Sequence, residues 1–122
     1  IDVIAKVGGL DIAGMVGCYL GAAICQMPIL IDGFISAVSA YLACMLNQTA
    51  KEYMIPTHCS AEPAAKMIME KLGMEAPLHA GMHLGEGTGA IMGLSLIDQA
   101  LNVYYHVATF EGGHVEAYTH QV

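Results

Sequence analysis

The stretch "PILIDGFISAVSAYLACMLN", residues 28–47, decides the fold class of this chain of 122 residues. Residues 28–32 form a short apolar run bounded by proline and glycine, which is typical of a buried parallel strand. Residues 33–47 are rich in alanine, leucine and isoleucine, and they predict a helix that begins directly after the strand. A strand followed at once by a helix is the repeating unit of α/β folds, in which the sheet is parallel.

The same alternation continues on both sides of this unit. Ser60 is expected to cap the helix that follows the second strand, Pro63 is tolerated in its first turn, and Gly73 suits its end. The expected elements are helices over 10–26, 60–73 and 86–108, a short strand over 53–58, an extended segment over 76–84, and a polar tail over 109–122. The chain is therefore predicted to be a single domain, 1–122, with a three-layer, mostly parallel sheet flanked by helices.

The composition is unusually apolar for a small domain. Apolar residues make up 56% of the chain and charged residues 12%, whereas soluble domains average about 45–50% and about 25%. A small domain has much surface for its volume and should need more polar residues. We therefore expect that a partner covers part of this surface, that the chain belongs to something larger, or that it enters a membrane.

A membrane hairpin is the least favoured of these explanations. Residues 12–31 and 33–50 carry no charge, so each approaches the length of a spanning segment. Pro28 divides the first run, however, and Asp32 separates the two runs without a flanking lysine or arginine. The chain also has no tryptophan for an interfacial belt. These features favour a buried helix and a buried strand, and no membrane association is predicted.

Charge and cysteine usage limit the class of function further. The net charge is −7, with four lysines and no arginine, which argues against a nucleic-acid-binding protein because such proteins need a basic face. The four cysteines, at 18, 25, 44 and 59, form no C-x-x-C pair. They are interpreted as reduced thiols, which predicts a cytoplasmic protein. No signal peptide is recognised, and the start resembles the middle of a longer chain.

Three polar or glycine-rich turns are expected to meet at one edge of the sheet. They are residues 32–34, 57–60 and 85–89, and each follows a strand or an extended segment. Ligands of open parallel sheets bind beyond the carboxyl ends of the strands. The sequence therefore predicts a binding site at this edge.

The loop "HLGEGTGA", residues 83–90, is the strongest candidate for chemistry. It could cradle a phosphate or present Glu86 to a ligand, but it matches neither the Walker A loop nor the dinucleotide fingerprint. Glu86 itself could simply complement the start of a helix. Alternatively it could be a general base, with apolar surroundings that raise its pKa and with Gly85 and Gly87 leaving room for the ligand.

Two other candidates have equally open alternatives. Asp32 could cap the helix that begins at residue 33, or it could bind a ligand hydroxyl or orient a loop. The Lys6-Val7-Gly8-Gly9 stretch precedes a predicted helix, so Lys6, Gly8 and Gly9 could hold a phosphate or form an ordinary turn.

A metal site is considered and not favoured. The spacing of His79, His83 and Glu86 would place them on one helical face, but the glycines of this stretch argue against a helix. His58 and Cys59 are further possible ligands, yet no spacing matches a known zinc signature. The remaining histidines are predicted to be solvated in or near the tail: His106, His114 and His120.

A set of segments resembles one enzyme family, nicotinate-nucleotide–dimethylbenzimidazole phosphoribosyltransferase. The G-E-G-T-G loop, with D-G-F and H-C-S-A-E-P upstream, is specific as a set, and the resemblance covers nearly the whole chain. The segments, in family order, are "AKVGGLDIAGMVG" (5–17), "PILIDGFISAVSA" (28–40), "YMIPTHCSAEPAAK" (53–66), "HLGEGTGAIMGLSLIDQA" (83–100) and "ATFEGG" (108–113).

The resemblance implies a reaction and roles for the candidate residues. The family transfers phosphoribose from nicotinate mononucleotide to a benzimidazole-type base, releasing nicotinate and forming α-ribazole phosphate for the lower ligand of cobalamin. Glu86 would take the proton of the attacking base, and Leu84 would line the base pocket. The other implied substrate-binding residues are Lys6, Gly8, Gly9, Asp32, Gly85 and Gly87, and no cofactor or metal is implied.

The resemblance also implies that a large part of the enzyme is absent from this chain. Family members are much longer, so the chain would be the C-terminal portion of a doubly wound fold. It differs from the usual pattern at Asp11, Cys59 and His83. The isolated chain is expected to be inactive and to need a homo-oligomer, such as a homodimer, or a partner that supplies the missing half. The alternative is a non-catalytic binding or assembly module of the same fold.

Overall fold

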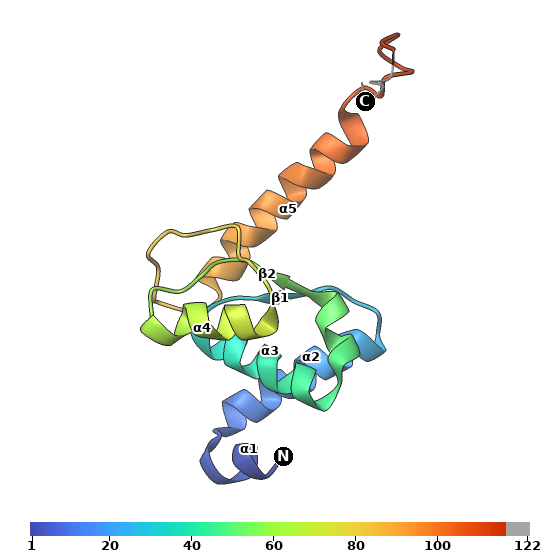
Figure 1. Cartoon of the computed structure of the whole chain (residues 1–122). Coiled ribbons are helices and arrows are strands. Elements are labelled where there is room, and N and C mark those ends of the chain that lie inside the picture. The colour runs from blue at the N-terminus through green and yellow to red at the C-terminus, as the bar shows by residue number, and fades with distance from the viewer. Residues whose placement is uncertain (117–122) are drawn as a thin grey trace, which may run out of the picture.

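The computed structural model describes residues 1–116, and its elements follow the predicted alternation of helices and strands (Figure 1). In chain order they are α1 (Asp2–Val7), α2 (Leu10–Ile24), β1 (Ile29–Ile31), α3 (Phe34–Leu46), the 3₁₀ helix η1 (Gln48–Tyr53), β2 (Met54–Pro56), α4 (Pro63–Leu72) and α5 (Thr88–His106).

The sheet is parallel, as predicted, and small. Strands β1 and β2 pair in register from Ile29 opposite Met54 to Ile31 opposite Pro56. The expected extended segment over 76–84 adds one parallel bridge, between His58 and Leu78, and no strand of its own. In Figure 1, α2, α3 and α4 lie on one side of the strands, and α5 rises from the other. The described residues therefore form part of an α/β fold.

Small side chains bring the helices of the core close together. Ala40 and Ala43 on α3 are fully buried, and Ile31 at the end of β1 is 1% exposed. The hydroxyl of Thr57 donates to the carbonyl oxygen of Ile31 over 2.7 Å, which fixes the end of β2 to the end of β1. The base of the predicted binding edge is therefore closely packed and buried.

The predicted helix boundaries are correct within a few residues, but the capping role of Ser60 is wrong. Helix α4 begins at Pro63 with Glu62 at its N-cap, and no side chain caps it. The hydroxyl of Ser60 instead donates to the carbonyl oxygen of Met82 over 3.3 Å. The turn between Ser60 and Pro63 places Ser60 too early to cap the helix. Gly73 ends α4 in the left-handed conformation, φ 61°, as predicted.

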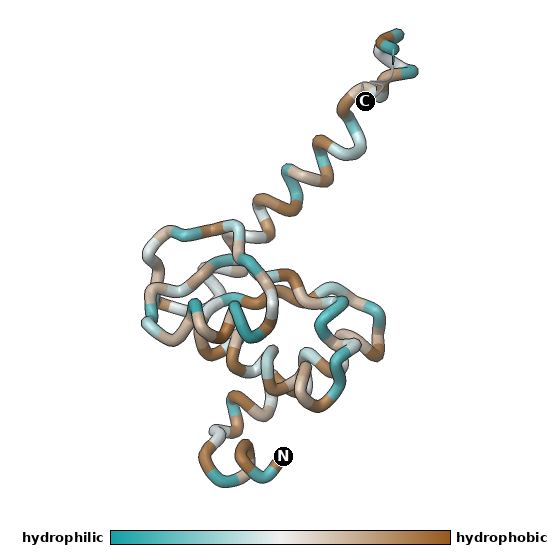
Figure 2. Tube along the Cα trace, in the orientation of Figure 1, coloured by the Kyte–Doolittle hydropathy of each residue, from teal (hydrophilic) through white to brown (hydrophobic). Residues whose placement is uncertain are grey.

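Helix α5 leaves the rest of the described chain after its first turns (Figure 1). Only Gly89 and Gly93 are buried on it, and apolar and polar residues alternate along its projecting part (Figure 2). The most exposed apolar side chains of α5 include Ile91, Val103, Tyr104 and Tyr105. The apolar excess in the composition is thus visible as uncovered surface.

The apolar runs and the start of the tail can be compared with the remaining expectations from the sequence. Across residues 1–116, no helix combines the length and the apolarity needed to span a bilayer. Residues 109–116 are exposed, as are His106 and His114, which confirms the prediction that these histidines are solvated. The rest of the predicted tail, including His120, lies outside the described residues.

The burial of Tyr19 can be tested by the pH dependence of the free energy of unfolding. Its side chain is 3% exposed, its hydroxyl donates to the carbonyl oxygen of Leu30 over 3.4 Å, and burial raises its pKa above the ordinary 10.0. The folded chain therefore keeps this proton at a pH where the unfolded chain has lost it, so the free energy of unfolding falls as pH rises above about 10. We expect a shallower fall for Tyr19→Phe, measured by urea unfolding between about pH 8 and 11. Equal slopes for the two proteins would contradict the prediction.

Candidate functional site

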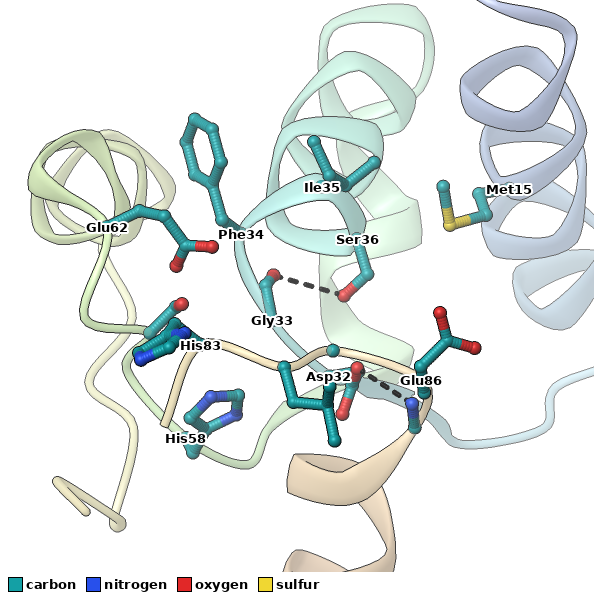
Figure 3. Close-up of a pocket in the computed structure, with 14 residues that line it drawn as sticks. Met15, Asp32, Gly33, Phe34, Ile35, Ser36, His58, Glu62, His83 and Glu86 are labelled. Atoms are coloured by element: carbon teal, nitrogen blue, oxygen red, sulfur yellow. Dashed lines mark hydrogen bonds between the residues drawn. The ribbon is translucent and has the colours of Figure 1, made fainter. Parts of the chain in front are cut away.

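The three predicted turns meet around one cavity of about 450 Å³ beyond the ends of β1 and β2 (Figure 3). The turn after β1, the segment after β2 and the loop before α5 form its walls. Its lining residues are Met15, Asp32, Gly33, Phe34, Ile35, Ser36, His58, Ser60, Glu62, His83, Leu84, Gly85, Glu86 and Gly87. This geometry agrees with the predicted binding site at this edge of the sheet. Five of the predicted site residues line the cavity: Asp32, Leu84, Gly85, Glu86 and Gly87.

Asp32 orients the loop at the start of α5. Its Oδ2 accepts a hydrogen bond from the Gly87 amide over 3.1 Å, and its Oδ1 accepts one from the Ala90 amide over 2.9 Å. Helix α3, which Asp32 was alternatively expected to cap, has Gly33 at its N-cap and no side-chain cap. A carboxylate at a helix N-terminus satisfies free amides and complements the helix dipole. Of the predicted alternatives, the structure therefore supports the orientation of a loop.

The loop holds three successive residues in the left-handed region. The φ angles are 76° at Gly85, 56° at Glu86 and 78° at Gly87. A non-glycine residue at such an angle is strained by about 1–3 kcal/mol, and such strain clusters at functional sites. Thr88 supports the turn, because its hydroxyl donates to the carbonyl oxygen of Gly85 over 2.6 Å. The loop thus presents one carboxylate between two glycines.

The Glu86 carboxylate points away from Asp32, towards the space between Ser36 and Met15 (Figure 3). Glu86 is exposed, and Leu84 is 72% exposed. The predicted apolar enclosure of Glu86 is therefore not complete in the described residues. Met15, Phe34 and Ile35 are apolar but line only part of the cavity.

The structure does not bring Lys6, Gly8 and Gly9 to this cavity. Gly8 and Gly9 line a separate depression of about 370 Å³ at the start of α2, and Lys6 is exposed on α1. The Asp11 carboxylate lies against Gly9, so a negative charge already occupies the space beside this helix N-terminus. A role of these three residues in phosphate binding stays a prediction.

His58 and Glu62 line the cavity but were not among the predicted site residues. His58 was considered only as a possible metal ligand. His58 is 4% exposed and packs against Gly89, where any side chain would collide with its ring. Glu62 points into the cavity from the start of α4 (Figure 3). The signal for both was present in "THCSAEP", a polar segment directly after a strand.

The helical geometry that would align the possible metal ligands is not present in residues 79–86. Residues 79–86 are not helical, so the spacing of His79, His83 and Glu86 does not align them. His79 lines a different pocket from His83 and Glu86. Within residues 1–116, no three histidine, cysteine, aspartate or glutamate side chains come together in a way that could hold a metal ion.

A cavity at the carboxyl ends of parallel strands, with a strained glycine loop that presents one carboxylate, is typical of α/β enzymes that bind small molecules. A family model described as phosphoribosyltransferase matches residues 1–115, and the chain belongs to this family.

The relatives agree with this assignment. The chain is 50% identical, over all its 122 residues, to the nicotinate-nucleotide–dimethylbenzimidazole phosphoribosyltransferase of Acetivibrio thermocellus, of which it covers 35%. It is 52% identical over 118 residues to the Clostridium acetobutylicum enzyme of the same name, covering 97% of the chain and 34% of that enzyme. The crystal structure of the Thermus thermophilus enzyme of that name superposes with a TM-score of 0.86 at 33% identity, covering 95% of this chain and 35% of that one.

The chain thus spans about a third of the length of these relatives. The resemblance stated from the sequence is confirmed at the level of the family and of the partial coverage. The assignment of this third to the C-terminal portion stays a prediction, as do the roles of the site residues.

Proposed function

We propose that this chain supplies the base-binding part of the active site of a phosphoribosyltransferase. The enzyme would transfer phosphoribose from nicotinate mononucleotide to dimethylbenzimidazole or a related base, giving α-ribazole phosphate and nicotinate for the cobalamin lower ligand. The observation that carries the proposal is the strained loop that presents Glu86 to the cavity beside Leu84. The names of the relatives support the choice of substrates.

The reaction needs a proton acceptor at this position. One ring nitrogen of the base attacks C1′ of the ribose, and the C1′–nitrogen bond to nicotinate breaks with its electron pair leaving on nicotinate. The other ring nitrogen of the attacking base must lose its proton. The Glu86 carboxylate takes this proton, while Gly85 and Gly87 leave space for the flat ring and Leu84 contacts its apolar face.

The charge of the cavity suits the transition state of this transfer. Three carboxylates line it, from Asp32, Glu62 and Glu86, and none of the described lining residues is a lysine. Negative groups placed beforehand stabilise the positive charge that develops on the ribose as the bond to nicotinate breaks. The same charge disfavours a phosphate in this cavity, so other residues would hold the phosphate.

The proposed enzyme therefore needs more protein than this cavity. The remaining two thirds of the relatives, as the same polypeptide or as a partner, or a second copy in a homodimer, would supply the phosphate site and cover the apolar surface. The isolated chain is expected to be inactive. Its four cysteines are free, which supports a cytoplasmic location.

A hybrid enzyme tests the proposal. This 122-residue chain replaces the matching third of the Acetivibrio thermocellus relative, and the product is assayed with nicotinate mononucleotide and dimethylbenzimidazole. We expect α-ribazole phosphate and nicotinate in equal amounts, detected by chromatography and mass spectrometry. The unaltered relative is the positive control. A folded hybrid that forms neither product would overturn the proposal.

A binding or assembly module is the second candidate. The exposed apolar side chains of α5 favour it, because contiguous apolar surface often marks an interaction site. Such a module would associate without chemistry. A hybrid that assembles to the same size as the relative, and that does not turn over although its Glu86 loop is intact, would support this candidate.

A further inference from the structure

The cavity contains two buried polar atoms without a hydrogen-bond partner in the described residues. They are Nδ1 of His58 and Oε2 of Glu62, and both residues line the cavity that contains Glu86. Buried polar atoms in proteins almost always have a partner, so each exception requires a physical explanation.

Packing explains the His58 atom. Its Nδ1 faces Gly89 so closely that even a methyl group there would collide with it. A ligand therefore has no room to reach this nitrogen. His58 instead fills the space between the end of β2 and α5, and its ring also lies near Gly33. Its role is to support the first turns of α5, which carry the Glu86 loop.

Packing does not explain the Glu62 atom in the same way, because the Glu62 side chain is only partly buried and lines the cavity. It stands at the N-cap of α4 but makes no capping hydrogen bond, so its side-chain oxygens do not satisfy the amides of the first helical turn. In Figure 3 its carboxylate lies between Phe34 and His83, facing Gly33. The segment thus places a partly buried carboxylate in the cavity wall, where a bound molecule could meet it.

The charge of the site limits the group that could fill this position. An ionised carboxylate only accepts hydrogen bonds, so its partner must be a donor. Both oxygens of Asp32 are already occupied by backbone amides. A phosphate would be repelled by the carboxylates of Asp32, Glu62 and Glu86. Among the groups of the proposed nucleotide substrate, a neutral hydroxyl is a donor that fits this position.

We propose that Glu62 determines specificity for the sugar, by accepting a hydrogen bond from a ribose hydroxyl of the nucleotide substrate. The inference rests on the proposed function, in which the ring N–H of the attacking base is already assigned to Glu86. The 2′- and 3′-hydroxyls are then the donors of nicotinate mononucleotide nearest the reacting carbon. A hydrogen bond to a charged acceptor changes binding by roughly 10- to 100-fold.

The test is a double-mutant cycle between protein and ligand. In the hybrid enzyme, nicotinate mononucleotide and its 2′-deoxy and 3′-deoxy forms are titrated by calorimetry against wild type, Glu62→Ala and Glu62→Gln. We expect one deoxy form to bind wild type about 10- to 100-fold more weakly. The same deoxy form should bind Glu62→Ala no more weakly than the ribonucleotide does. Glu52→Ala, an exposed glutamate outside the cavity, should behave as wild type.

The melting temperature of Glu62→Gln is a second readout. If Glu62 had a structural role, the substitution would lower this temperature. Because Oε2 of Glu62 is buried without a partner, Glu62→Gln should leave the melting temperature of the ligand-free protein unchanged or raised. A lowered melting temperature, or equal losses for the deoxy ligands in wild type and Glu62→Ala, would overturn the inference alone. If wild type binds no nicotinate mononucleotide and forms no product, the proposed function fails, and the inference fails with it.

Discussion

Glu86→Gln is expected to lower turnover of the hybrid enzyme by roughly 10²–10⁴-fold, which is the usual contribution of a general base. Glutamine keeps the shape of the side chain and can still occupy the left-handed position between Gly85 and Gly87. It cannot accept the proton from the ring nitrogen of the base. Steady-state kinetics should therefore show the loss in kcat, with KM for both substrates nearly unchanged.

Two comparisons make this result specific. Glu52→Gln, on an exposed helical turn outside the cavity, should leave kcat unchanged. Product formed by Glu86→Gln at the wild-type rate would show that another group takes the proton. A rise in KM with unchanged kcat would assign Glu86 to binding instead of proton transfer.

Asp32→Ala should destabilise the chain by roughly 1.5–3 kcal/mol and disorder the loop that presents Glu86. The substitution removes the two acceptors of the Gly87 and Ala90 amides. Urea unfolding measures the first effect. Hydrogen exchange measures the second, because these two amides should exchange faster than those further along α5.

Asp32→Asn is the matched variant for this prediction. It retains one oxygen acceptor, so we expect it to protect one of the two amides and to lose less stability than Asp32→Ala. Turnover of both variants should fall in the hybrid, since the base would no longer be held in position. Unchanged exchange at Gly87 and Ala90 in Asp32→Ala would refute the role of Asp32 as the support of the loop.

The fold class and the location of the site could be predicted because both depend on local patterns. The apolar run that ends at Ile31, followed by the helix from Phe34, identifies a strand–helix unit without knowledge of any distant contact. The carboxyl ends of such strands meet at one edge, so the convergence of 32–34, 57–60 and 85–89 followed from topology. The glycines around Glu86 indicated a special backbone, which the three positive φ angles now describe.

What the sequence could not decide depends on contacts between distant residues. Ser60 has the right side chain to cap a helix, but α4 begins only at Pro63, so Ser60 lies before the cap position and its hydroxyl donates to Met82. For Asp32 the sequence left helix capping, ligand binding and loop orientation open, and hydrogen-bond partners 55 and 58 residues away favour the loop. Glu62 was assigned no role because a glutamate before proline is ordinary at a helix start. Its place in the cavity wall depends on the fold, which brings the loop before α5 to the same cavity.

The long separation between Asp32 and its two amide partners has a consequence for synthesis. The ribosome delivers residue 32 long before residues 87 and 90, and the turn after β1 can fold while the Glu86 loop is still inside the exit tunnel. The loop can take its left-handed shape only after the first turns of α5 have emerged and reached Asp32. Assembly of the Glu86 loop is thus postponed until the α/β framework is in place. A released chain that ends before Ala90 should contain the framework but no ordered Glu86 loop.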